Sequence, residues 1–146
     1  MRLKRLCLPL ALPMALLLAL PPAQADAVSA AAKLSQALGV PGLQVKAVPK
    51  RRAAQVHQDY AVTDGSGKDI ASIIQAPAAS FSDWKQVPDF QALTGVGQEA
   101  YARPEIDQLC ARSATGAACL TLVPGAFPAG KKPSLEQRKA ALAALI

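Results

Sequence analysis

A hairpin with one cysteine in each strand is the feature that most constrains how this sequence can fold. The segment LCARSATGAACLTL contains Cys110 and Cys119 on either side of a short run of small residues and a glycine. We expect a strand over residues 109–112, a turn around residues 114–116 and a second strand over residues 118–123, which Pro124 ends. If the chain reverses between the first two turn residues, the two cysteines stand directly opposite each other. A one-residue shift with the glycine in a bulge would place them on a diagonal instead.

Three roles compete for this pair: a disulfide, half of a metal site, or a reactive thiol. Directly opposed Cβ atoms lie about 4.5 to 5.5 Å apart, and a disulfide needs about 3.5 to 4.5 Å, so a disulfide requires only a small adjustment. A structural zinc site needs four ligands, whereas the chain offers His57 and carboxylates at no ligand spacing. A nucleophilic thiol needs a positioned base, and nothing in the sequence brings His57 to it. The disulfide is favoured, and it should add about 2 to 3 kcal/mol of stability.

The first 25 residues predict the compartment in which such a bond forms. Three basic residues stand among the first five, residues 6–20 are almost wholly apolar, and residues 23–25 read Ala-Gln-Ala, a small-x-small cleavage pattern. A membrane span is the alternative, but the apolar run is shorter than about 20 residues and contains prolines. We therefore expect a signal peptide over residues 1–25 and a periplasmic or secreted product that starts at Asp26, with no stable membrane span. Exported proteins fold under oxidising conditions.

Residues 26–146 fit one domain of ordinary size. Loss of residues 1–25 removes three basic residues, so 13 basic residues face 10 acidic ones and the net charge falls from +6 to +3. A charge this small and scattered does not indicate a nucleic-acid partner. The dense basic cluster is Lys50-Arg51-Arg52, for which a solvated loop and a specific contact with an anion or lipid surface both remain open.

Local patterns predict an α+β domain in which an antiparallel sheet of four to five strands carries the N- and C-terminal helices on one face. The first helix covers residues 26–39, with Asp26 or Ser29 as its cap and Gly39 at its end. The last helix begins at a capping box formed by Ser134 and Gln137. Strands are expected over residues 43–47, 55–63, 68–76, 109–112 and 118–123, with a short extended piece ending at Tyr101. For residues 68–76 the periodicity also suits a helix, but the preceding Asp-Gly-Ser-Gly turn favours a hairpin strand.

Several residues are candidates for function, each beside a structural interpretation. Residues 95–100 match the G-x-G-x-x-A dinucleotide fingerprint but do not lie between a strand and a helix, so Gly95 and Gly97 are read as a structural turn. His57 and Asp59 share the wet side of one predicted strand, as a binding patch or a solvated face. Phe81, Trp84 and Phe90 are read as core residues in preference to ligand contacts.

Four motifs occur in a recognisable order: Ala37-Leu38-Gly39, Tyr60, Leu-x-Gly-Val-Gly-x-Glu-Ala-Tyr at residues 93–101, and Leu120-Thr121-Leu122. In this order the chain resembles a group of small secreted bacterial proteins of unknown function, which includes lipoproteins and extracellular sensor-like domains of some kinases. Family members often carry a cysteine just before the strand tyrosine, where this chain has Asp59. The resemblance implies an α+β fold and a role in binding or sensing, and it implies no catalytic residues.

The expected function is that of an exported, non-enzymatic envelope protein. We expect it to bind an envelope ligand or protein partner, without a cofactor, through the wet sheet face and the Gly95–Tyr101 segment, which includes Glu99. One alternative is a periplasmic inhibitor or immunity protein that blocks a hydrolase with its stapled hairpin, since a rigid loop loses little entropy on binding. Another is an enzyme that uses His57.

Overall fold

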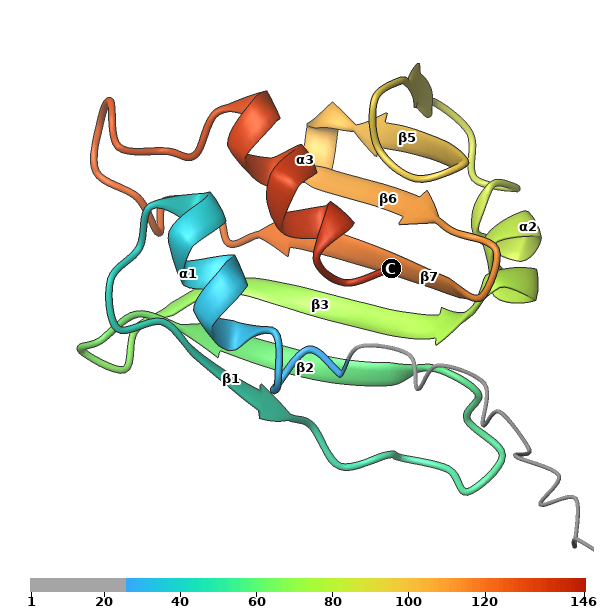
Figure 1. The fold of residues 1–146 in the computed structure, drawn as a ribbon, viewed down its shortest axis with the longest axis horizontal. Coiled ribbons are helices and arrows are strands. Elements are labelled where there is room, and N and C mark those ends of the chain that lie inside the picture. Colours follow the sequence, from blue (N-terminus) through green and yellow to red (C-terminus); the bar gives the residue numbers. More distant parts are fainter. Residues whose placement is uncertain (1–25) are drawn as a thin grey trace, which may run out of the picture.

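Seven antiparallel strands form one sheet in the computed structural model, which describes residues 26–146 (Figure 1). The signal peptide predicted for residues 1–25 lies outside the described residues. The spatial order of the strands is β1-β2-β3-β7-β6-β5-β4. Their bounds are β1 (Gln44–Ala47), β2 (Gln58–Thr63), β3 (Asp69–Pro77), β4 (Gln91–Leu93), β5 (Glu99–Arg103), β6 (Gln108–Arg112) and β7 (Gly116–Leu122). The helices are α1 (Ala31–Leu38), α2 (Phe81–Trp84) and α3 (Leu135–Ala143), with 3-10 turns at Ala78–Ser80 and Pro104–Ile106.

The α+β class and the antiparallel sheet are confirmed, but the prediction of four to five strands is wrong. The sheet is wider because β5 is a full strand and because β4 was missed altogether. Because β4 has only three residues, its side chains alternate just once between the two faces. A strand this short shows no periodic pattern in the sequence. It is a strand because it pairs with β5, where Ala92 lies opposite Tyr101.

Helices α1 and α3 lie together on one face of the sheet (Figure 1). The main core lies between them and the strands, and its largest fully buried side chains include Leu34, Val62, Ile73 and Leu142. Helix α1 ends as predicted at Gly39, which adopts a φ of +67°. Its N-terminus differs from the prediction, because the cap position is Ala30 and no side chain caps it.

Both predicted hairpins and the final capping box are present. Asp64 closes the turn between β2 and β3. Its Oδ1 accepts hydrogen bonds from the Ser66 hydroxyl at 2.6 Å and from the Ser66 and Lys68 amides at 2.9 and 3.0 Å. The bond from the Ser66 hydroxyl, followed by the bond from the Lys68 amide, lowers the pKa of the Asp64 carboxyl group. The segment after this turn is strand β3, as predicted. At the start of α3, Ser134 Oγ accepts from the Gln137 amide at 3.2 Å, and the Gln137 side chain accepts from the Ser134 amide at 2.8 Å.

A buried glutamine joins the two ends of the described chain. Gln75 points from β3 toward the helices and is 6% exposed. Its Oε1 accepts a hydrogen bond from the Ala27 amide at 2.9 Å, and its Nε2 donates to the Leu145 carbonyl at 2.8 Å. One polar side chain therefore holds the segments that flank α1 and α3 against the middle of the sheet.

Candidate functional site

The face of the sheet opposite α1 and α3, called the far face below, carries a row of paired side chains. Residues directly opposed on antiparallel strands point to the same side. The register connects the following residues in spatial order across five strands: Asp59, Ile74, Cys119, Cys110 and Tyr101. The last three belong to a buried cluster separate from the core beneath the helices. We call these five residues the central row.

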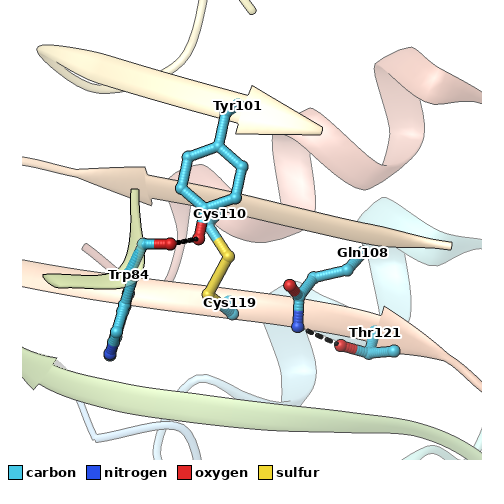
Figure 2. Close-up of a disulfide and its surroundings, with 6 residues drawn as sticks. All are labelled: Trp84, Tyr101, Gln108, Cys110, Cys119 and Thr121. Atoms are coloured by element: carbon cyan, nitrogen blue, oxygen red, sulfur yellow. Dashed lines mark hydrogen bonds between the residues drawn. A yellow bond between two sulfur atoms is a disulfide. The ribbon is translucent and has the colours of Figure 1, made fainter. Parts of the chain in front are cut away.

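The middle of the central row is a disulfide between Cys110 and Cys119 (Figure 2). The cysteines are directly opposed in β6 and β7, and their Cα atoms lie 4.1 Å apart. This short separation is that of a non-hydrogen-bonded pair. The predicted pairing and its register are confirmed. A disulfide of this kind indicates an oxidising compartment.

The region around α2 covers part of the far face beside the disulfide (Figure 2). The Phe81 ring lies 5.4 Å from the Tyr101 ring, and the Phe90 ring lies 5.5 Å from it on centroid distances. The Tyr101 hydroxyl donates to the Trp84 carbonyl at 3.2 Å. Burial raises the pKa of Tyr101, which is only 2% exposed. Tyr101 therefore holds α2 on the sheet, and most of its ring is closed to solvent.

Two hollows adjoin on the rest of the far face, and we call them together the trough. The larger has a volume of about 380 Å³, and its lining includes Val48, Asp59, Ser72, Ile74 and Val123. The smaller, of about 160 Å³, is lined by Ile74, Trp84, Val87, Tyr101, Arg103, Gln108 and Cys119. Ile74 borders both, so the trough runs along the central row from β2 toward β5.

A polar row runs beside the central row. Ser72 lies opposite Thr121, Thr121 opposite Gln108, and Gln108 opposite Arg103. Gln108 Nε2 donates to Thr121 Oγ1 at 3.0 Å (Figure 2). Arg103 Nε contacts Glu105 Oε1 at 3.0 Å. The trough thus combines an apolar centre with hydroxyl, amide and guanidinium groups along one side.

His57 and Asp59 lie together at the β2 end of the far face. His57 Nε2 is 3.7 Å from Asp59 Oδ2, and both side chains are about two-fifths exposed. Asp59 stands in the same row as Tyr101 but four strand spacings away, which is roughly 19 Å at about 4.8 Å per strand. The candidate residues of the sequence therefore share one face without forming one compact site.

Glu99 lies at the other end of the sheet, in β5. One of its carboxylate oxygens accepts from Lys85 Nζ, and the other accepts from Arg112 Nε at 3.1 Å. These two hydrogen bonds, from Lys85 and then from Arg112, lower the pKa of Glu99. The carboxylate therefore joins the segment after α2 to β5 and β6.

Gly97, the second glycine of the G-x-G pattern, lies so close to the backbone of Arg112 that no side chain fits there. Its φ is +60°, and a Cβ atom there would lie 2.4 Å from the Arg112 carbonyl oxygen and 2.8 Å from Ile146 Cδ1. The adjacent Gln98 amide donates to the same carbonyl at 2.8 Å. Gly95 has a φ of +83° and lies near Lys139 Nζ. Both glycines have a structural role in the turn that leads into β5.

Sequence reasoning missed the polar side of the trough. Thr121 and Gln108 alternate with buried neighbours in β7 and β6, which marks each as facing away from the helices. That alternation was the available signal. It does not reveal that the two residues are directly opposed, because their pairing depends on the register between strands.

The described residues show neither a metal centre nor a membrane-spanning helix. Between residues 26 and 146, no cluster of three or more His, Cys, Asp or Glu side chains is arranged to bind a metal ion. None of the helices in this range has both the length and the apolar character that a bilayer span requires.

Comparisons of the chain with protein-family models, curated proteins and solved structures found no match.

Proposed function

We propose that this chain is an exported, non-enzymatic envelope protein that binds a peptide or a peptide-bearing partner in the trough of the far face. The observation that supports this proposal is the adjoining pair of hollows that share Ile74. Ligand sites are typically concave and apolar with a few placed polar groups. Ile74 and Trp84 offer an apolar surface, while Ser72 and Gln108 offer hydrogen-bonding groups that suit the amides of an extended peptide.

Two further features support the export of the protein and its role in binding. The Cys110–Cys119 disulfide fits a periplasmic or secreted protein released by cleavage before Asp26. The resemblance of residues 93–101 to small secreted bacterial proteins supports binding or sensing. An intact mass of protein taken from the cell envelope tests the setting, because it reports both the cleavage site and the oxidation of the two cysteines.

The binding test compares a blocked trough with a matched surface variant. Ser72 is exposed in the trough, so Ser72→Arg places a long side chain across it. Gln36→Arg adds the same charge on the exposed side of α1. Soluble muropeptides and a panel of short synthetic peptides are screened by thermal shift against the wild type and both variants. We expect a ligand that stabilises the wild type and Gln36→Arg but not Ser72→Arg.

Two results contradict the proposal. A ligand that stabilises all three proteins equally binds outside the trough. Turnover of ester, peptide or glycan substrates by the wild type, lost in His57→Ala while folding is retained, would instead establish the enzyme alternative.

A second candidate function is that of a periplasmic inhibitor or immunity protein, which would block a hydrolase with the tip of the β6–β7 hairpin. Ser113 orders this tip, because its Oγ accepts from the Thr115 and Gly116 amides at 3.3 and 3.1 Å. The hairpin strands lie inside the sheet between β3 and β5, so the exposed residues at the tip are Ala114 and Thr115. Arginine substitutions at these two positions should abolish inhibition of a target hydrolase if this function is correct.

A further inference from the structure

A long loop, residues 48–57, connects β1 and β2 (Figure 1), and its side chains surround a basic hollow. The hollow has a volume of about 450 Å³ and is lined by Arg51, Arg52, Ala54, Gln55 and His57. Both arginines are exposed. The loop thus presents two guanidinium groups and an imidazole around one open space.

Gln55 holds this loop in place through both ends of its side chain and through its backbone. Its Oε1 accepts from the Arg51 amide at 3.3 Å, and its Nε2 donates to the His57 carbonyl at 3.2 Å and to Asp59 Oδ2 at 3.3 Å. Its amide donates to the Arg52 carbonyl at 3.1 Å, and its carbonyl accepts from Lys50 Nζ at 3.1 Å. None of these bonds uses a guanidinium group, so the loop is ordered while both arginine heads stay available.

The free guanidinium groups set this loop apart from the other arginines of the described chain. Residues 26–146 contain five arginines. Three of them approach a carboxylate within 4 Å, namely Arg103, Arg112 and Arg138. Arg51 and Arg52 form no ion pair and no side-chain hydrogen bond with any residue between 26 and 146.

We propose that the β1–β2 loop is an oxyanion site that takes a phosphate group between Arg51, Arg52 and His57. Guanidinium groups match phosphate oxygens with two parallel hydrogen bonds, and such charge-assisted bonds are the stronger kind. Because Gln55 already orders the backbone, less conformational entropy is lost on binding. The nearby Asp59 carboxylate opposes an anion, but its Oδ2 is engaged by Gln55 and lies beside His57.

The loop hollow and the peptide-binding trough have different lining residues, although Asp59 of the trough accepts a hydrogen bond from Gln55 of the loop. Arg51 and Arg52 do not line the trough, and Ser72 does not line the loop hollow. The same phosphate chemistry could be presented by a soluble phosphate ester or by a lipid headgroup. Because the two sites are tested with different variants and different ligands, failure of the oxyanion site does not contradict the peptide-binding trough, and the reverse also holds.

The test uses a double variant and a control of equal charge change. Arg51→Gln/Arg52→Gln removes both guanidinium groups and keeps side-chain length. Lys33→Gln/Lys131→Gln removes two charges from exposed lysines elsewhere. Binding of inorganic phosphate and glycerol phosphate is measured by NMR titration near physiological ionic strength, where distant surface charges are screened. Co-sedimentation with phosphatidylglycerol/phosphatidylcholine vesicles, compared with phosphatidylcholine alone, tests the lipid source. Thermal unfolding confirms that each variant folds.

We expect amide shifts in residues 50–57 on addition of phosphate or of anionic vesicles. Affinity should fall by at least about tenfold in the arginine variant and stay unchanged in the lysine variant. Binding to soluble phosphates indicates a small ligand, whereas binding only to phosphatidylglycerol vesicles indicates a headgroup, and both support the site. The proposal is overturned if neither probe binds up to about 10 mM phosphate, or if the lysine variant loses as much affinity as the arginine variant.

Discussion

Gln75→Leu should be among the most destabilising single changes in this protein, although it replaces a polar residue with an apolar one of similar size. The Gln75 side chain is the partner of two main-chain groups, the Ala27 amide and the Leu145 carbonyl. Both of those residues are 0% exposed. Leucine offers these two buried groups neither an acceptor nor a donor.

The magnitude follows from this burial. A buried backbone group left without a partner costs about 1 to 3 kcal/mol, so two such groups cost roughly 2 to 6 kcal/mol. Burial of the leucine side chain offsets part of this loss. We therefore expect the free energy of unfolding to fall by about 2 to 4 kcal/mol, a large share of the 5 to 15 kcal/mol typical of a domain.

Urea unfolding followed by circular dichroism measures this loss. The midpoint should fall while the slope stays constant, because the folded state buries the same surface. Gln44→Leu is the matched control, since Gln44 is exposed on β1 and its replacement should change stability by less than about 0.5 kcal/mol. If Gln75→Leu unfolds at the wild-type midpoint, the two hydrogen bonds contribute nothing and the reasoning fails.

Three further outcomes follow from other parts of the fold. Cys110→Ala/Cys119→Ala should lower stability by about 2 to 3 kcal/mol, and wild-type protein under reducing conditions should lose a similar amount; equal urea midpoints with and without the bond would refute this. Gly97→Ala should cost more than about 1 kcal/mol, and more than Gly130→Ala, because both glycines have positive φ but only the first faces a backbone atom within 3 Å; the two thermal shifts can be compared directly. Burial, followed by the hydrogen bond that the Tyr60 hydroxyl donates to the Asp26 carboxylate, raises the pKa of Tyr60 to about 12. The stability linked to this shift is complete below the unfolded-state pKa of about 10 and is lost as the pH rises toward 12. Urea midpoints measured across this range should fall less in Tyr60→Phe than in the wild type, and parallel curves would argue against the shift.

Sequence reasoning succeeded where neighbouring residues decide the structure. The turn before β3, the capping box of α3 and the register of Cys110 with Cys119 all depend on contacts within about ten positions, and each is confirmed. It failed on β4, whose strand conformation depends on pairing with β5 and leaves almost no periodic signal. It also expected Tyr101 to be available for binding, whereas α2 folds over that ring.

The candidate sites divide in the same way. The basic cluster that includes Arg51 and Arg52 is visible in the sequence, but its hydrogen-bonded loop is not, because Gln55 bonds to groups on both sides of it. The sequence also shows that Asp59 occupies a solvent-facing position of a strand. It does not show that Asp59 lies in one row with Ile74 and Tyr101, because that row depends on the register between strands.

The amino-acid sequence by itself determined the α+β class, the two hairpins and the covalent link between adjacent strands, because alternation, turn chemistry and cysteine spacing act over short stretches of chain. Only the tertiary structure decided the strand order β1-β2-β3-β7-β6-β5-β4. That order places β7 beside β3, and the paired residues are 39 to 51 positions apart in the chain. Such non-local pairing is selected by the joint burial of α1 and α3 on one face, and it alone brings the halves of the trough together around Ile74.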